Sequence, residues 1–326
     1  MPLSDDDNTI WASAPWTPTK PLNTTQPPTI PGYQKHIPYL RHSNPLQTLT
    51  IYVPSTGQQP PSTPTPPPTP GGIWILYIHG GAWRDPLIDA SSFHPAATSL
   101  LLRNHTAPGN PLAGLVSINY RLSPHPSHPS SEPAYNARHP DHIYDVLSAI
   151  SFLQRAGVAK EGRYILAGHS CGATMAFQAV MDSSRWDLRG IKIKKPEVVV
   201  GLNGIYDLVG VIRGGGYEKG LRDAYEEFTR GAFGTEEEVW RGVCPTTASG
   251  GRGWVGEWEG RKGVVLVQSG EDGLVPRGQL EGMREVLERE GVKVEEKEAG
   301  GGHDEMWERG EGRMAEVLWE VVVGME

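Results

Sequence analysis

The feature that most constrains the fold is a regular alternation of short apolar runs and helical stretches, which begins at residue 73. The apolar runs are IWILYIH, GLVSINY, YILA, PEVVVGLNG and GVVLVQSG. Continuous runs of this kind, bounded by glycine, are typical of strands that are buried on both faces. Stretches with helical spacing separate them, such as 137–157 and 276–290. The alternation predicts an α/β fold with a mostly parallel central sheet and helices on both faces.

The domain organisation is indicated by changes in composition. Residues 1–46 are rich in Pro, Thr and Asn and are expected to form an irregular N-terminal segment, whereas 47–326 are expected to form a single domain. Within that domain, the Pro/Thr-rich tract 55–72 has almost nothing to bury and predicts a flexible loop between two strands. Residues 205–260 contain short helical pieces without a clear strand and predict a small helical cap region.

The bulk composition argues against several classes of protein. The chain of 326 residues carries a net charge of −8, which disfavours nucleic acid as a partner. No apolar run approaches the ~20 residues of a membrane span, and the acidic start lacks the apolar region of a secretion signal. Two cysteines, Cys171 and Cys244, fit a reducing compartment. We therefore expect a cytoplasmic protein with a small-molecule substrate, and a homodimer is compatible with the sequence.

The most informative motif is GHSCG at 168–172, which has Ser170 at its centre. The apolar, β-prone run YILA precedes it, and ATMAFQAVM, which has helical composition, follows it. Strand, sharp turn and helix form the setting of a nucleophile elbow, in which the serine lies in a strained turn between small residues. A chance occurrence is the alternative, because the chain contains 40 glycines. The context favours Ser170 as a nucleophile.

A serine nucleophile needs a base and a carboxylate that orients the base. His303, in AGGGHDEMW, is the only histidine that follows Ser170 and is the predicted base. Asp272 fits best as the acid, because it directly follows the buried run GVVLVQSG and precedes a predicted helix. Three other carboxylates remain as alternatives: Asp207 above all, and also Glu271 and Asp304.

A second loop, YIHGGAWRDP at 77–86, follows the first buried run. Its paired glycines allow backbone N–H groups to turn toward a developing oxyanion. The predicted donors are the amides of Gly81 and Ala82, together with the amide of Cys171 directly after the serine. A turn without chemical function is the alternative.

Three motifs carry a family resemblance: HGGxW at 79–83, NYRLSP at 119–124 and GxSxG at 168–172. Together they resemble the hormone-sensitive-lipase-like branch of the α/β-hydrolases. Within that branch, HGGAWRDP, HPDHIYDV at 139–146 and GHSCGAT are similar to the fungal kynurenine formamidases (arylformamidases). The resemblance covers roughly residues 73–325 and leaves the N-terminal segment unplaced.

The resemblance implies a serine hydrolase of the α/β-hydrolase fold, without metal or cofactor, that converts N-formyl-L-kynurenine to L-kynurenine and formate in tryptophan degradation. It assigns the oxyanion amides to Gly81 and Ala82. The substrate has a flat aromatic ring, and Trp83, beside the oxyanion loop, is the candidate for the wall of its pocket, with simple packing as the alternative.

Other functions are weighed against this interpretation. A carboxylesterase of the same fold that acts on small acyl esters is the main alternative. A non-catalytic, receptor-like α/β-hydrolase is disfavoured, because such proteins commonly lack part of the machinery. A metal hydrolase is disfavoured because the sequence has no HExxH motif, and His139 and His142 are interpreted as contacts at a helix start. No glycine-rich stretch matches a phosphate or dinucleotide loop.

Overall fold

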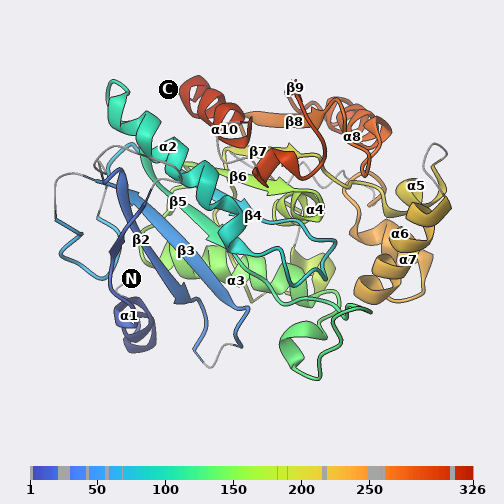
Figure 1. The fold of residues 1–326 in the computed structure, drawn as a ribbon, viewed down its shortest axis with the longest axis horizontal. Coiled ribbons are helices and arrows are strands. Elements are labelled where there is room, and N and C mark those ends of the chain that lie inside the picture. The colour runs from blue at the N-terminus through green and yellow to red at the C-terminus, as the bar shows by residue number, and fades with distance from the viewer. Residues whose placement is uncertain are drawn as a thin grey trace.

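The computed structural model describes residues 3–20, 30–41, 44–55, 59–67, 69–181, 183–188, 190–214, 219–248, 258, 261–308 and 313–325. At its centre lies a nine-stranded sheet with the order β1-β2-β3-β5-β4-β6-β7-β8-β9 (Figure 1). The strands are β1 (Thr17–Pro18), β2 (Gly32–Pro38), β3 (Thr48–Pro54), β4 (Ile73–Ile78), β5 (Leu112–Ile118), β6 (Tyr164–His169), β7 (Val198–Leu202), β8 (Gly263–Ser269) and β9 (Val294–Ala299). The pairs from β5 through β9 are parallel, while β1, β2 and β3 pair antiparallel, which confirms the expected mostly parallel sheet.

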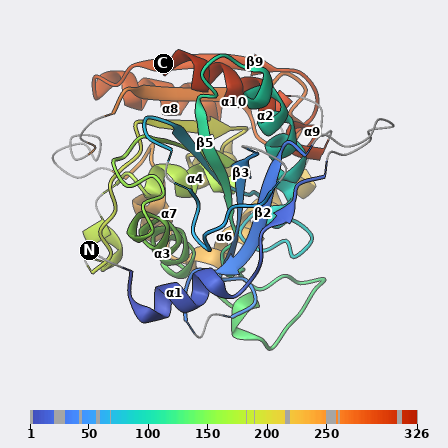
Figure 2. The same ribbon diagram turned by 90° about the vertical axis from the view of Figure 1, so that its left-hand side faces the viewer.

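Helices cover both faces of the sheet, as Figure 2 shows from the side. They are α1 (Asp5–Ala12), α2 (His94–Thr106), α3 (Asp141–Arg155), α4 (Cys171–Gln178), α5 (Leu208–Arg213), α6 (Lys219–Phe233), α7 (Glu237–Val243), α8 (Arg277–Arg289), α9 (Glu305–Glu308) and α10 (Arg313–Gly324). In β4, Leu76 and Ile78 face the core beneath α3, α4 and α8, while Ile75 and Tyr77 face the core beneath α2 and α10. Because both faces of β4 are buried, its sequence is a continuous apolar run.

The expectation that residues 1–46 are irregular is wrong for much of this segment. Strand β2 pairs with β3 along its whole length, and α1 packs Trp11 against Phe152 with ring centroids 5.0 Å apart. The alternation in β2 is hidden because Lys35 occupies an inward position. Its ammonium group donates hydrogen bonds to the carbonyl oxygens of Trp11 (3.0 Å) and Pro64 (2.8 Å), which satisfy the buried charge.

The proline-rich tract forms neither helix nor strand in its described parts, 59–67 and 69–72. Two of its backbone carbonyls accept hydrogen bonds from side chains of the N-terminal segment. Lys35 binds the carbonyl of Pro64, and the indole N–H of Trp16 donates to the carbonyl of Thr63 (2.9 Å). The tract therefore lies against the edge of the sheet formed by the N-terminal strands.

The expected cap region contains the helices α5, α6 and α7, which lie together at one end of the molecule (Figure 1). Residues 215–218, 249–257 and 259–260 of this region lie outside the described residues. A search of the described chain for a helix long and apolar enough to cross a membrane finds none.

Candidate active site

The polar residues singled out in the sequence follow the carboxyl ends of the parallel strands. His79 follows β4, Tyr120 follows β5, Ser170 follows β6, Asp272 follows β8 and His303 follows β9. Neighbouring parallel strands end at one edge of the sheet, which is where open α/β sheets hold their ligands. The fold thus gathers these residues at a single edge.

Ser170 lies in the turn between β6 and α4 with φ 54° and ψ −120°, a conformation that residues other than glycine rarely adopt. The flanking glycines make this turn possible. A Cβ atom at position 168 would lie 2.2 Å from the Gly172 carbonyl oxygen, and one at position 172 would lie 2.2 Å from the Ile78 carbonyl oxygen. The strained turn presents Ser170 at the start of α4, where the first backbone N–H groups have no partner within the helix.

The predicted base and acid are in direct contact. The Nδ1 atom of His303 lies 2.8 Å from Oδ2 of Asp272, and both side chains are almost fully buried. Asp272 Oδ1 also accepts the backbone N–H groups of Leu274 (2.9 Å) and Val275 (2.8 Å), while Oδ2 accepts the Gln268 amide (2.9 Å). In the neutral imidazole tautomer that donates Nδ1–H to this carboxylate, Nε2 carries the lone pair.

The rival acids have other roles in the structure. Asp207 caps α5, with Oδ1 accepting the Gly210 N–H at 2.9 Å, which is the alternative role considered for it. Asp304 accepts the indole N–H of Trp307 at 3.2 Å. Glu271 is exposed. Among the described residues, Asp272 is the carboxylate that contacts the His303 ring.

Two further residues, neither of which was expected from the sequence to have a role, hold His303 in place. The His303 carbonyl oxygen accepts hydrogen bonds from Nε2 of His169 (3.0 Å) and from the Asn203 amide (3.1 Å). The rings of His169 and His303 lie 4.6 Å apart, so His303 lies beside the Ser170 turn. Burial lowers the pKa of His169 well below its usual value, and the ring is neutral. Their position at the ends of strands could have pointed to this role, because His169 is the last residue of β6 and Asn203 directly follows β7.

The loop after β4 has three successive residues with positive φ: Gly81 (94°), Ala82 (48°) and Trp83 (59°). The Gly81 N–H donates no hydrogen bond within the part of the chain that the structure describes. The Trp83 N–H donates to the sulfur of Cys171 (3.3 Å), and the Ala82 N–H also lies close to this sulfur. Burial raises the pKa of the Cys171 thiol to about 11, so the thiol beside the serine stays protonated and unreactive at neutral pH.

Trp83 has no exposed surface in the structure. Its ring packs against Phe228 (5.9 Å between centroids) and edge-on against Phe233 (5.0 Å), both on α6. These contacts correspond to the alternative role considered for Trp83, namely packing, and they join the loop after β4 to the cap region. A contact between Trp83 and a substrate ring remains a prediction.

One group of potential metal ligands occurs at this edge, namely His169, His303 and Asp304, whose ligand atoms lie within 4.8 Å of one another. One nitrogen of each ring is already used, because Nε2 of His169 donates to the His303 carbonyl and Nδ1 of His303 is bonded to Asp272.

Comparison with known proteins agrees with this geometry. No protein-family model matches the chain. It is 37% identical over 298 residues to the kynurenine formamidase-like hydrolase fscH of Fusarium equiseti, covering 85% of this chain and 90% of that protein. It is 35% identical over 256 residues to the kynurenine formamidase avaC of Aspergillus versicolor, covering 74% of this chain and 85% of that protein.

Solved structures show the fold. Esterase B of Lactobacillus rhamnosis superposes with a TM-score of 0.65 at 14% identity, over 90% of this chain and 84% of that one. A hormone-sensitive lipase from a metagenome library superposes with a TM-score of 0.57 at 19% identity, over 85% and 81%. The fold is therefore that of the α/β-hydrolases, as the motifs predicted. On the strength of its fungal relatives, this chain is a hydrolase that belongs to the kynurenine formamidase family.

Proposed function

We propose that this hydrolase converts N-formyl-L-kynurenine to L-kynurenine and formate, with Ser170 as nucleophile, His303 as base and Asp272 as the residue that orients the base. The hydrogen bond between Asp272 and His303, beside the strained Ser170 turn, is the observation that carries the proposal. The relatives named kynurenine formamidase support the choice of substrate.

In the first half-reaction, the Ser170 hydroxyl attacks the formyl carbon. A bond forms between the serine oxygen and that carbon, the carbonyl electron pair moves onto the formyl oxygen, and Nε2 of His303 takes the serine proton. The amides of Gly81 and Cys171 are the main donors that we assign to this oxyanion, with Ala82 as the third. The C–N bond then breaks, and His303 returns the proton to the departing aniline nitrogen, which releases L-kynurenine.

In the second half-reaction, water attacks the formyl-enzyme. His303 takes one proton from this water, and the second tetrahedral intermediate collapses with the serine oxygen as leaving group. Formic acid departs and releases the second proton of the water to solvent, which gives formate, and the proton held by His303 returns to Ser170. Throughout the cycle Asp272 keeps Nδ1 protonated and stabilises the imidazolium that forms twice.

The chemistry of the substrate suits such a site. The acyl group is only H–C=O, so it needs little room, and an aniline is a better leaving group than an alkylamine. The two cysteines are free and buried, which agrees with our proposal that the reaction occurs in the cytoplasm.

The test combines a labelling experiment with a substrate panel. A fluorophosphonate should label the protein at Ser170 and should fail to label Ser170→Ala, which should lose nearly all activity. N-formyl-L-kynurenine should give a higher kcat/KM than p-nitrophenyl butyrate or the N-acetyl analogue. A tenfold preference for the butyrate, about 1.4 kcal/mol of transition-state binding, would replace the formamidase with a carboxylesterase. Full activity in Ser170→Ala would remove the nucleophile assignment altogether.

A further inference from the structure

We propose that Tyr120 is a positioning residue that fixes the orientation of the peptide group between Gly80 and Gly81, and so directs the Gly81 N–H toward the oxyanion. This inference rests on the proposed function, because it takes the Gly81 amide as an oxyanion donor. Tyr120 belongs to the NYRLSP motif, to which the reaction itself assigns no role.

The Tyr120 hydroxyl contacts two carbonyl oxygens of the oxyanion loop, and that of Gly80 is the nearer. Its hydroxyl oxygen lies 2.9 Å from the Gly80 carbonyl oxygen and 3.1 Å from that of His79. The Gly80 carbonyl also accepts Nδ1–H of His79 at 2.9 Å, and the His79 ring stacks on the Tyr120 ring with centroids 4.4 Å apart. Two buried donors therefore hold the same carbonyl oxygen.

The geometry of the peptide group carries this restraint to the amide. In a trans peptide the C=O and N–H bonds point in opposite directions. A Gly80 carbonyl held toward Tyr120 and His79 therefore turns the Gly81 N–H to the other side. Between two glycines the backbone gives little resistance to rotation of the peptide plane. The restraint therefore comes from two side chains, the His79 ring within the loop and the Tyr120 hydroxyl from outside it.

Tyr120 also joins the oxyanion loop to the serine turn. Its hydroxyl lies 3.6 Å from the sulfur of Cys171, and the same sulfur accepts the Trp83 N–H at 3.3 Å. Burial raises the pKa of the Tyr120 hydroxyl well above its usual value and that of the Cys171 thiol to about 11. Both groups therefore stay protonated, so the thiol can donate to the phenol oxygen while the phenol donates to Gly80.

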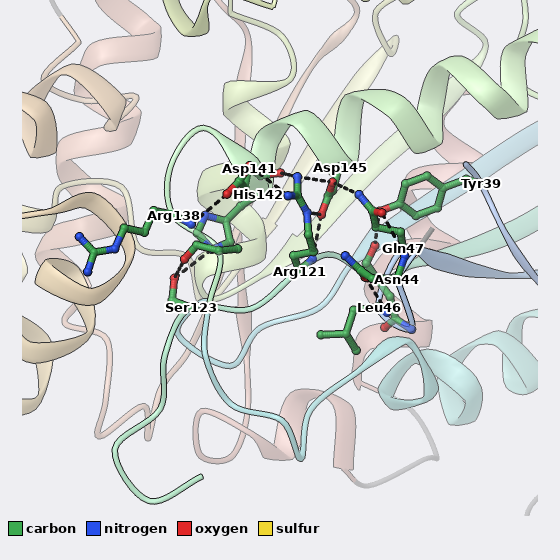
Figure 3. Close-up of polar contacts among 12 residues, drawn as sticks. Tyr39, Asn44, Leu46, Gln47, Arg121, Ser123, Arg138, Asp141, His142 and Asp145 are labelled. Carbon is green, nitrogen blue, oxygen red and sulfur yellow. Dashed lines mark hydrogen bonds and ion pairs between the residues drawn. The ribbon is translucent and has the colours of Figure 1, made fainter. Parts of the chain in front are cut away.

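The residues that follow Tyr120 in the chain are anchored, as the close-up in Figure 3 shows. Arg121 donates its backbone N–H (2.9 Å) and its Nε–H (2.8 Å) to the buried carboxylate of Asp145 on α3. The Ser123 hydroxyl contacts Nε2 of His142 at 3.0 Å, and the Ser123 backbone N–H donates to the Trp83 carbonyl at 2.8 Å. Helix α3 thus anchors residues 120–123, and these residues in turn contact the oxyanion loop.

Loss of the Tyr120 hydroxyl should therefore affect the transition state more than the bound substrate. The Gly80–Gly81 peptide could then rotate and turn a carbonyl oxygen toward the developing negative charge. The formyl group of the bound substrate carries no full charge, so its binding depends less on this amide.

The experiment compares Tyr120→Phe with a matched control, Tyr164→Phe. Tyr164 on β6 is equally buried, and its hydroxyl donates to the Lys194 carbonyl at 2.9 Å. For Tyr120→Phe, kcat should fall about 10- to 100-fold on both N-formyl-L-kynurenine and p-nitrophenyl acetate, with KM within about twofold. Inhibition by phenylboronic acid, which forms a tetrahedral serine adduct, should weaken by a similar factor, whereas binding of the product L-kynurenine should not change.

Tyr164→Phe should lower Tm by about as much as Tyr120→Phe does, but it should leave kcat unchanged. Equal kcat values for the two variants, or a rise in KM that accounts for the whole loss, would overturn the inference and leave Tyr120 as packing. Cys171→Ala is the second variant in case Tyr120→Phe does not fold. It removes a contact to the same hydroxyl and should lower kcat by a smaller factor, and an unchanged kcat would count against the inference. Ser170→Ala separates the two proposals, because full activity there would defeat the proposed function itself.

Discussion

Individual hydrogen bonds decide which of several neighbouring acids can act on His303. Asp272 presents Oδ2 to the His303 ring while two backbone N–H groups hold Oδ1, so the carboxylate cannot rotate freely. Asp207 follows the neighbouring strand and looks similar in the sequence, yet its carboxylate is used at the start of α5. The difference arises from the local turn after each strand.

Replacing Asp272 with Asn should test this assignment with little change in shape. The Asn amide N–H₂ would donate to Nδ1 of His303, which would move the ring proton to Nε2 and remove the base. We expect kcat/KM to fall by a factor on the order of 10⁴, with an unchanged circular dichroism spectrum. Asp207→Asn is the matched control, because Asn caps helices as well as Asp does, and it should stay within about twofold of the parent. A larger loss in Asp207→Asn than in Asp272→Asn would show that the acid is misassigned.

A buried ion pair between Arg121 and Asp145 connects the segment after β5 to α3. The Asp145 side chain has no exposed surface, and it accepts hydrogen bonds from Arg121 and from the Gln47 amide (2.8 Å). Burial raises the pKa of the Asp145 carboxyl, and the hydrogen bonds from Arg121 oppose this effect. Together with Gln47, which directly precedes β3, the pair joins the start of β3, the NYRLSP motif and α3 (Figure 3).

Arg121→Met should therefore be strongly destabilising, because it leaves the Asp145 carboxylate buried without its cation. A loss of about 3–5 kcal/mol in the free energy of unfolding is expected. Arg213→Met is the control, since the Arg213–Glu237 pair is exposed, and it should cost about 0–1 kcal/mol. Urea denaturation of both variants measures the difference, and equal losses would contradict a structural role for the buried pair.

At the scale of the whole molecule, the periodicity of the sequence predicted the central strands, and the order of its motifs predicted the edge of the sheet where the site lies. The runs in β4 to β8 are apolar on both faces, so their pattern is unambiguous, and the order of Ser170, Asp272 and His303 pointed to one edge of the sheet. Strand β2 was missed because Lys35 interrupts its alternation. The contacts of Tyr120 could not be predicted, since its partners are backbone carbonyls, which every residue carries.

The buried histidines make the stability of the folded chain depend on pH. Burial lowers the pKa of His79 to about 4 and that of His142 to about 3, whereas an unfolded histidine titrates near ~6.5. Below pH 6.5 the unfolded chain therefore binds more protons than the folded one, and stability falls as the pH decreases toward 4. His142→Gln, which keeps a donor for Ser123, should reduce the slope of unfolding free energy against pH by about 1 kcal/mol per pH unit near pH 5.5. Urea denaturation between pH 7 and pH 5 measures this slope, with the exposed His105→Gln as control, and equal slopes in the two variants would contradict the role of the buried imidazole.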